Sequence, residues 1–496
     1  MYIIWNIEVI MNLNRISLFK KFHTDTNYYI YDTCTNKILR VSKIIYDIID
    51  KFLLEGSQSV LSYFEEAYPL EALKEAVFQL EQIIEMEQYF STLRSLRLQF
   101  PLTTQEIEKS LDYGIQQLIL GITEACNLRC AYCAYSGKYY FQRTHTKRFM
   151  PLHIAKSAIE YYDQHSNDVE TRCITFYGGE PLLAIETIQQ VIDHVKKNFS
   201  QNYMFNLSTN GTLLNGETTR LLIENDVALL VSLDGPAEVH NSVRAYPDGD
   251  GSFDMIIQNL RALKEEDPNY YKRKVVFRPT ISRFDKIESM YKFFSENSEN
   301  HDLFEGQYVS TGFVDPFDNS MKEGVISTDN GIGYHNLLEK YKQIKVHGLE
   351  VPLFFNEMFE VKLKKIHKRD ASLIPDSLYP NGICCPGVRR LFCTVDGHYT
   401  ICERVNSGLI IGDVRHGIDP TKVISLVEHY IKISDADCSR CWGVRFCTNC
   451  FTAIYGNQFD IERKRQVCNL FLKELENMMK LYCSIRELNY TAFDNL

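Results

Sequence analysis

Three cysteines lie close together in the run CNLRCAYC, spaced as CxxxCxxC at Cys126, Cys130 and Cys133. Three thiolates on one loop can bind three irons of a 4Fe–4S cubane, which leaves the fourth iron without a protein ligand. An open iron can chelate the amino and carboxylate groups of a small molecule and pass an electron into it. A zinc site is the alternative, because thiolates also bind zinc.

A second group of cysteines lies in the last quarter of the chain. Its members are Cys384, Cys385, Cys393, Cys402, Cys438, Cys441, Cys447, Cys450 and Cys468. Disulfides are rare in a reducing compartment, so clustered cysteines there more often bind metal or carry out redox chemistry. Paired CxxC units suit zinc as well as iron–sulfur clusters, and both stay open. Cys34, Cys173 and Cys483 stand apart, and we expect them to be small buried hydrophobic residues.

The elements that must position the first group alternate between strand and helix. Predicted strands occupy 117–123, 173–179, 204–210, 228–235, 274–281 and 307–314. Amphipathic helical patterns follow most of them, which implies parallel strands with helical crossovers. We therefore predict an α/β fold with a partial (β/α)6 barrel of TIM type over about 110–320. In such barrels the site is built from loops at the carboxyl ends of the strands.

Polar motifs follow the predicted strands in order. The run YGGEP (177–181) ends the second strand, LSTNG (207–211) the third and SLDG (232–235) the fourth, and Arg244 lies in HNSVR. Together with the CxxxCxxC loop after the first strand, this order resembles the radical S-adenosylmethionine (radical SAM) superfamily. The resemblance covers roughly residues 115–315.

The resemblance implies that S-adenosylmethionine binds the open iron and is cleaved to a 5′-deoxyadenosyl radical, which abstracts hydrogen from carbon. It implies an adenine contact at one aromatic residue, a methionine amino contact at the GGE motif, and ribose or carboxylate contacts beyond. The implied cofactor-binding residues are Tyr132, Gly178, Gly179, Glu180, Ser208, Asn210, Asp234 and Arg244. The two glycines would let the backbone approach closely. Taken singly, each polar residue has an equally good reading as a strand-end cap or turn former.

The second cysteine group resembles the SPASM domain, a C-terminal extension with two auxiliary iron–sulfur clusters. The implied ligands of the outer cluster are Cys438, Cys441, Cys447 and Cys468. The implied ligands of the inner cluster are Cys402, Cys450 and either Cys384 or Cys385, and CxxG with Gly387 favours Cys384. The family usually has three residues before the last cysteine of the quartet, where this chain has two. A fourth inner ligand from Cys385 or Cys393 is left open; without one, an open iron could bind a substrate thiolate.

The first hundred residues have a different pattern. Predicted strands at 28–32 and 37–41 flank the turn TCTN, and Ser42 is the expected N-cap of the first of three helices. This pattern predicts a winged-helix-like module that resembles the element binding the leader peptides of ribosomally made precursors. Such modules present a strand edge to which an extended peptide adds. The alternative is that this segment merely caps the barrel.

Length, charge and hydropathy limit the protein class. A chain of 496 residues allows two or three domains, and we expect divisions at 1–100, 110–320 and 345–496. The net charge of −10 argues against general nucleic-acid binding. The apolar runs fall short of the ~20 residues of a membrane span. The first residues are a poor signal peptide, and Met11 is a second possible start. We expect a cytoplasmic protein without membrane or nucleic-acid partners.

The resemblances to radical SAM and SPASM proteins and to the leader-binding element together imply a maturase of a ribosomally synthesised, cysteine-rich peptide that forms intramolecular thioethers. Its expected partners are a precursor peptide with a leader and an electron donor such as flavodoxin or ferredoxin. Carbon–carbon crosslinking, epimerisation and decarboxylation of a peptide are alternatives within the class. Formylglycine formation by an anaerobic sulfatase-type maturase is another, although such enzymes place CxxxCxxC near the chain start. A non-enzymatic iron–sulfur or zinc scaffold is the alternative outside it.

No dedicated catalytic acid or base can be identified from the sequence. Tyr177, Arg278 and Glu403 are candidate neighbours of the site. Each of them has an equally good interpretation as a packing residue or a surface ion pair.

Overall fold

The computed structural model describes residues 18–90, 96–137, 143–296, 299–314, 332–380, 384–405, 408–451 and 459–495. The first residues, which bear on a signal peptide and on Met11, lie outside this part. Within the described ranges no helix is both long and apolar enough to cross a membrane.

Six parallel strands form the predicted α/β sheet in the order β11-β9-β8-β7-β6-β5. These strands are β5 (Gln117–Thr123), β6 (Thr171–Gly178), β7 (Asn202–Thr209), β8 (Ala228–Val231), β9 (Val275–Phe277) and β11 (Tyr308–Val309). The strands β10 (Thr280–Ile281) and β12 (Gly312–Phe313) form a small parallel pair beside them. The prediction of six parallel strands is therefore confirmed, with the last two shorter than expected.

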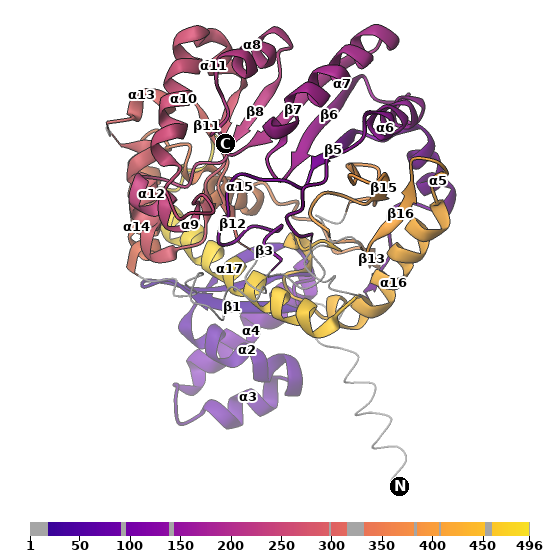
Figure 1. Cartoon of the computed structure of the whole chain (residues 1–496). Helices are drawn as coiled ribbons and strands as arrows, with labels where there is room; N and C mark the ends of the chain where they lie inside the picture. Colours follow the sequence, from indigo (N-terminus) through magenta and orange to yellow (C-terminus); the bar gives the residue numbers. More distant parts are fainter. Residues whose placement is uncertain are drawn as a thin grey trace.

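Helices connect these strands and cover the outer side of the sheet, as Figure 1 shows for α7, α8 and α10. The connecting helices are α6 (Leu152–Gln164), α7 (Ile185–Asn198), α8 (Gly216–Glu224), α9 (Ala237–Val243), α10 (Phe253–Glu266), α11 (Pro268–Lys274), α12 (Ile287–Ser295) and α13 (His301–Phe304). Each of the long ones buries one apolar stripe; α7 buries Ile188, Val191, Ile192 and Val195. This 3.6-residue spacing is why the sequence shows them clearly.

The C-terminal segment extends the same sheet. Strand β14 (Leu391–Cys393) pairs in parallel with β5, which gives a ten-stranded sheet ending in antiparallel strands. The added strands are β15 (His398–Thr400), β16 (Ile410–Asp413) and β17 (Gly417–Ile418). The remaining elements of this half are α14 (Ile332–Val346), a π-helical turn (Asn356–Glu360), α15 (Val361–His367), β13 (Ser377–Leu378), α16 (Pro420–Cys438) and α17 (Ile461–Leu488). One hydrophobic core runs through both halves.

The N-terminal module has three strands rather than the predicted hairpin. Strand β1 (Phe19–His23) pairs with β2 (Tyr28–Asp32), which pairs with β3 (Lys37–Val41). The helices α2 (Lys43–Glu55), α3 (Ser57–Phe64) and α4 (Leu70–Glu87) follow, and Ser42 caps α2 as predicted. The strand β4 (Arg97–Leu98) and the helix α5 (Thr104–Tyr113) lead into the barrel.

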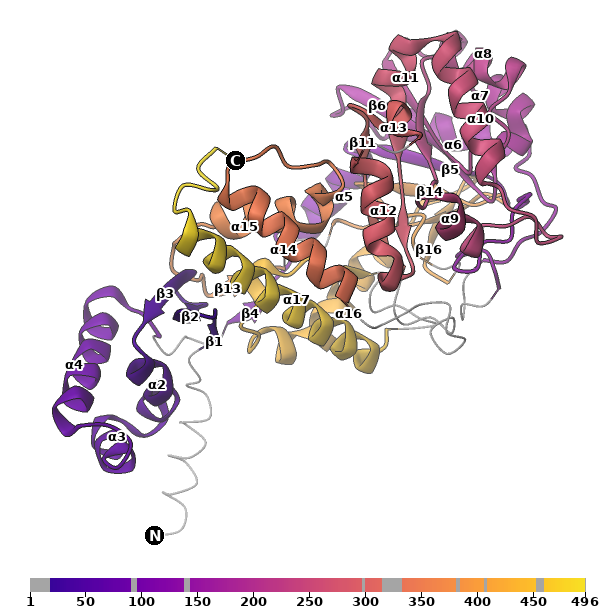
Figure 2. The ribbon, with the colours of Figure 1, turned by 90° about the vertical axis from the view of Figure 1, so that its left-hand side faces the viewer.

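The three-stranded sheet lies between two cores. Ile30 packs among the module helices, whereas Tyr29 and Tyr31 belong to the core of the main body. Alternate residues of a strand point to opposite faces, so β2 joins the module to the body. Figure 2 shows α2, α3 and α4 at one end of the molecule, the barrel at the other, and α17 between them.

Candidate functional site

The CxxxCxxC loop leaves the carboxyl end of β5, as the barrel prediction requires. Cys126, Cys130 and Cys133 are each half-buried. Burial raises the pKa of Cys126 to about 12 and that of Cys133 to about 11, and the charge of Cys130 contributes to both shifts. The thiols are thus close together, surrounded by protein and still reached by solvent. Metal binding removes such thiol protons, so this donor set fits a bound cluster.

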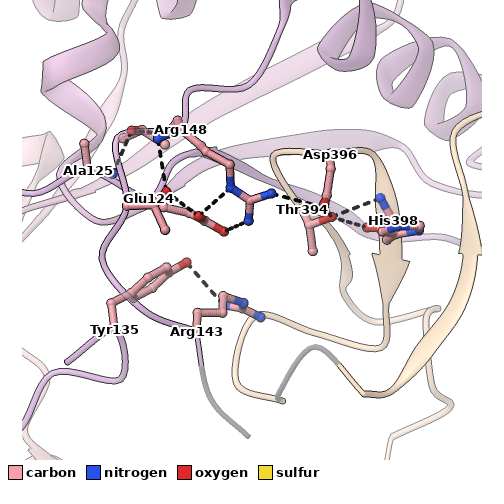
Figure 3. A network of polar contacts seen from close by, with 10 residues as sticks. Glu124, Ala125, Tyr135, Arg143, Arg148, Thr394, Asp396 and His398 are labelled. Atoms are coloured by element: carbon pink, nitrogen blue, oxygen red, sulfur yellow. Dashed lines mark hydrogen bonds and ion pairs between the residues drawn. The ribbon is translucent and has the colours of Figure 1, made fainter. Parts of the chain in front are cut away.

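An ion pair that the sequence analysis missed anchors the start of this loop. Glu124 is 7% exposed and accepts hydrogen bonds from Arg148, at 2.9 Å from Nε and 2.7 Å from Nη2. Arg148 Nη1 also lies 3.3 Å from Asp396 Oδ2, in the turn between β14 and β15 (Figure 3). The loop is therefore fixed to the C-terminal half two residues before Cys126.

The GGE motif at the end of β6 packs directly against the cysteine loop. A Cβ atom on Gly178 would lie 2.0 Å from the Thr123 carbonyl oxygen, and one on Gly179 would lie 2.2 Å from that of Ala125. The backbone N–H groups of Gly179 and Glu180 donate hydrogen bonds to these two carbonyls, at 2.9 and 2.8 Å. The close approach that requires glycine here is to the protein's own loop.

Glu180 and Asn210 join the second and third motifs to Cys126. The fully buried Glu180 carboxylate accepts hydrogen bonds from Thr209 Oγ1 at 2.8 Å and from the backbone N–H of Asn210 at 2.7 Å. Burial raises the pKa of Glu180 to about 7. Asn210 Nδ2 donates to Asn127 Oδ1 at 2.9 Å and lies 4.0 Å from Cys126 Sγ. Asn127, inside the cysteine motif, is a second residue that the sequence analysis missed.

Tyr132, Asp234 and Arg244 form a network beside Cys130. The buried Asp234 carboxylate accepts hydrogen bonds from the Tyr132 hydroxyl and, at 2.8 Å, from Arg244 Nε. Arg244 Nη1 lies 3.9 Å from Cys130 Sγ, and its guanidinium carbon lies 5.3 Å from the centre of the Tyr132 ring. The structure thus brings these three predicted residues together at the loop.

Ser208 and His145 complete the surroundings. Ser208 is half-buried on β7, two residues before Asn210, and its side chain makes no hydrogen bond to a described residue. His145 stacks on Tyr135, and both its ring nitrogens are buried without a hydrogen-bond partner within the described ranges. Unpaired buried nitrogens are costly, so this site too fits an additional bound group.

The implied ligands of the outer cluster gather around the start of α17. Cys438 ends α16, and Cys468 lies in the second turn of α17. Burial raises the pKa of Cys441 to about 11 and that of Cys447 to about 12, and the charges of Cys438 and Cys468 add to both. These four thiols are therefore mutual neighbours.

Cys384, Cys402 and Cys450 form a second set of neighbouring thiols. The charge of Cys450 raises the pKa of Cys384 and of Cys402, in addition to burial. Burial raises the pKa of Cys385, and the charge of Cys384 adds to this shift. Cys393 is fully buried in β14, and its thiol donates to the Thr394 carbonyl at 3.6 Å. Cys384, Cys402 and Cys450 thus act on one another, Cys385 adjoins Cys384, and Cys393 belongs to the core.

In neither of these two sets of described residues do the thiols converge on a single zinc ion. Ligands of one zinc ion lie within about 4 Å of one another, since each Zn–S bond is about 2.3 Å long. No three His, Cys, Asp or Glu side chains among the residues with a described position could hold such an ion.

Tyr177, Arg278 and Glu403 lie in one region between the first loop and Cys402. The charge of Glu403 adds to the burial that raises the pKa of Tyr177, while burial and the charges of two arginines lower that of Arg278. Glu403 Oε1 accepts a hydrogen bond from Arg390 Nη1 at 2.6 Å. Arg143 donates to the carbonyls of Glu403 and Val405, at 3.1 and 2.9 Å. Tyr177, Arg278 and Glu403 are therefore connected through neighbouring arginines, and none of them is singled out as a catalytic acid or base.

Part of this chain matches a known protein family and is similar to proteins with described activities. Residues 120–287 match the family described as the Radical SAM superfamily. A cysteine-type anaerobic sulfatase-maturating enzyme of Clostridium novyi (strain NT) is 31% identical over 187 residues, which are 37% of this chain and 48% of that protein. The radical SAM cyclopropyl synthase TigE of Paramaledivibacter caminithermalis is 29% identical over 197 residues, 37% of this chain and 39% of that protein.

A solved structure supports the fold. Native anSMEcpe with bound AdoMet superposes with a TM-score of 0.57 at 20% identity, over 77% of this chain and 100% of that one. This chain matches 48% of the length of the Clostridium novyi protein and 39% of the length of TigE. The family match, the order of motifs and the fold agree, and residues 120–287 of this chain form a radical SAM domain.

Proposed function

We propose that this protein is a radical SAM maturase that forms intramolecular thioethers in a ribosomally synthesised, cysteine-rich precursor peptide. The observation that carries the proposal is the N-terminal module, a three-stranded sheet with three helices that precedes the barrel. Its precursor would carry a leader, and flavodoxin or ferredoxin would supply electrons.

The residues around the CxxxCxxC loop would hold the cluster and S-adenosylmethionine. Cys126, Cys130 and Cys133 would bind three irons. When bound, the cofactor supplies a 5′-deoxyadenosyl radical that abstracts hydrogen from carbon. Glu180 and Asn210 fix the loop from β6 and β7, and the Asp234–Arg244 pair fixes it from β8. This chain's contribution is to hold the loop in one position relative to the bound substrate.

The sheet of the N-terminal module would capture the leader. Lys20 on β1 pairs with Glu476 on α17 at 2.7 Å, which places β1 beside the main body. Strand β3 is the other edge strand of this sheet. An extended leader would add to β3 as a fourth strand through backbone hydrogen bonds.

The second cysteine group would accept the electron that thioether formation releases. Joining carbon to sulfur removes one hydrogen from each: one leaves as a hydrogen atom to the adenosyl radical, the other as a proton and an electron. Cys384, Cys402 and Cys450 would hold the inner acceptor, and Cys438, Cys441, Cys447 and Cys468 the outer one. With three ligands, the inner cluster would keep an iron for a substrate thiolate.

Formylglycine formation is the second candidate, and the relatives favour it. The Clostridium novyi protein is a sulfatase-maturating enzyme, and anSMEcpe shares the fold. However, anSMEcpe is covered completely while part of this chain has no counterpart in it. The N-terminal module, for which we propose leader binding, is what favours the peptide-maturase assignment over formylglycine formation.

The test is co-expression with any short, cysteine-rich reading frame encoded beside the gene, followed by mass spectrometry after thiol alkylation. A thioether maturase removes two hydrogens for each link, and the linked cysteines resist alkylation. Cys126→Ala in the same experiment should leave the precursor unchanged.

Other outcomes decide between the alternatives. The same mass loss with every cysteine alkylated would indicate carbon–carbon linkage. An unchanged peptide together with active cleavage of S-adenosylmethionine would contradict the peptide assignment, and a sulfatase-derived peptide with a target cysteine should then be oxidised to formylglycine.

A further inference from the structure

Lys464 is a buried lysine beside the outer cysteine set. It lies in the first turn of α17 and is 2% exposed. Its Nζ donates a hydrogen bond to Cys438 Sγ at 3.5 Å. Within the part of the chain that the structure describes, Lys464 has no carboxylate within ion-pair distance. An unpaired buried ammonium is very costly, and among the described residues the thiolates, or what they bind, are the negative partner available to Lys464.

The first cysteine loop is balanced differently. Arg244 also approaches a thiol, at 3.9 Å from Cys130, but its Nε lies 2.8 Å from the Asp234 carboxylate. The negative charge of Asp234 therefore compensates much of the positive charge of Arg244 beside the first cysteine loop. Lys464 has no such counter-charge among the described residues, so its full charge acts on the outer set.

We propose that Lys464 raises the midpoint reduction potential of an iron–sulfur cluster held by Cys438, Cys441, Cys447 and Cys468. The inference rests on the proposed function, which assigns a cluster to these cysteines. One-electron reduction adds one negative charge to a cluster. A buried ammonium in contact with a ligand sulfur stabilises this more negative state, because charge and hydrogen bonds to the sulfurs set cluster potentials. Lys464 would thus make the outer cluster easier to reduce than it would be without the lysine.

The test measures potentials rather than turnover. The full chain carrying Cys126→Ala, Cys130→Ala and Cys133→Ala would be reconstituted with iron and sulfide, so that the auxiliary clusters are observed alone. Lys464→Met removes the charge at similar length, and Lys464→Arg keeps it. Lys473→Met is the matched control, because Lys473 is exposed on the same helix. Each protein would be titrated with dithionite and redox mediators and followed by electron paramagnetic resonance.

We expect Lys464→Met to lower one of the two midpoints. At the wild-type midpoint, the ratio of reduced to oxidised outer cluster should fall at least tenfold, which is about 59 mV for a one-electron couple. The other midpoint should stay in place, and Lys464→Arg and Lys473→Met should keep both near the wild-type values.

Two results would overturn the inference. One is an unchanged pair of midpoints in Lys464→Met with its iron content intact. The other is loss of the outer cluster from both Lys464→Met and Lys464→Gln, which would make the lysine an assembly residue. Failure of the proposed function would give a different result. The triple cysteine variant with Lys464 unchanged would then contain zinc, or no iron, after reconstitution.

Discussion

At the scale of single residues, Glu180, Asn210, Asp234 and Tyr132 are each held by a partner distant in sequence. Glu180 accepts a hydrogen bond from the backbone of Asn210, and Tyr132 donates one to Asp234. Such buried hydrogen bonds are expensive to break because the remaining partner loses its hydration and gains nothing. The consequence is a loop whose three thiols have little freedom.

The thiol of Cys126 gives the first prediction. Cys126→Ala should remove one iron ligand and abolish reductive cleavage of S-adenosylmethionine, since three thiolates are needed to hold the cubane. The measurement is 5′-deoxyadenosine formed under dithionite, together with iron per chain. Cys173→Ala is the control, because Cys173 lies half-buried on β6 and its sulfur accepts a hydrogen bond from Asn206. Equal loss of cleavage in both variants would contradict the assignment.

His240 gives a pH prediction. Its Nδ1 accepts a hydrogen bond from the backbone N–H of Asp234 at 3.2 Å, and its Nε2 lies 3.0 Å from Ser252 Oγ, so the ring is held neutral. Burial lowers the pKa of His240 to about 4. The unfolded chain takes up this proton near pH 6.5, so stability is lost as pH falls from about 6.5 towards 4.

This loss should amount to about 2 kcal/mol at pH 5 relative to pH 7. The measurement is urea unfolding of the wild type and of His240→Gln at both pH values. Both proteins share the contributions of the carboxyl groups, so the difference isolates His240. Identical pH dependence in the two proteins would exclude the predicted role.

At the scale of elements, the junction of β5 and β6 determines where the cysteine loop begins. The two strands pair in parallel, and the pairing continues past the strand ends as hydrogen bonds from Gly179 and Glu180 to residues 123 and 125. The absence of a side chain at two successive positions allows this. The GGE motif therefore supports the loop by its backbone and by its carboxylate.

Gly178→Ala should disrupt this junction. The new Cβ would meet the Thr123 carbonyl oxygen at 2.0 Å, and the φ of +141° already disfavours a side chain. We expect a loss of at least about 2 kcal/mol in the free energy of unfolding and less iron per chain. Gly216→Ala is the control, because its nearest atom is 3.8 Å away, and it should change stability by less than about 0.5 kcal/mol. Similar effects of both substitutions would argue against this account.

At the scale of the whole molecule, α17 connects parts that lie far apart in sequence. Its first turns carry Lys464 and Cys468, and its last turn carries Glu487. The Glu487 carboxylate accepts hydrogen bonds from four side chains of the N-terminal module, namely Thr24, Thr26 and Asn27 in the turn between β1 and β2, and Tyr29 on β2. One helix thus joins the outer cysteine set to the module proposed to capture the leader (Figure 2).

Glu487→Ala should loosen this module from the body. Removing the acceptor leaves four donors without their partner and should cost about 1–3 kcal/mol of docking free energy. Hydrogen exchange in β1 and β2 should become faster, while β5 to β8 keep their protection. Glu462→Ala on the same helix removes an exposed ion pair with Arg465, and it should leave exchange unchanged. Uniform exchange across the chain in both variants would contradict a local docking role.

The sequence by itself determined the CxxxCxxC loop, the order of the motifs and the six parallel strands. These depend on local spacing and on hydrophobic periodicity, which a sequence displays directly. The resemblance based on them led to the radical SAM domain. It also grouped Cys438, Cys441, Cys447 and Cys468, which the structure places together.

The tertiary structure alone decided the contacts between distant segments. It added β1 to the predicted hairpin and β14 to the edge of β5, and it placed Cys393 in the core. It also joined Lys464 to Cys438 and Arg148 to Glu124 and Asp396. Such pairings have no periodicity in the chain, because they follow from how whole elements pack to bury apolar surface and satisfy buried charges.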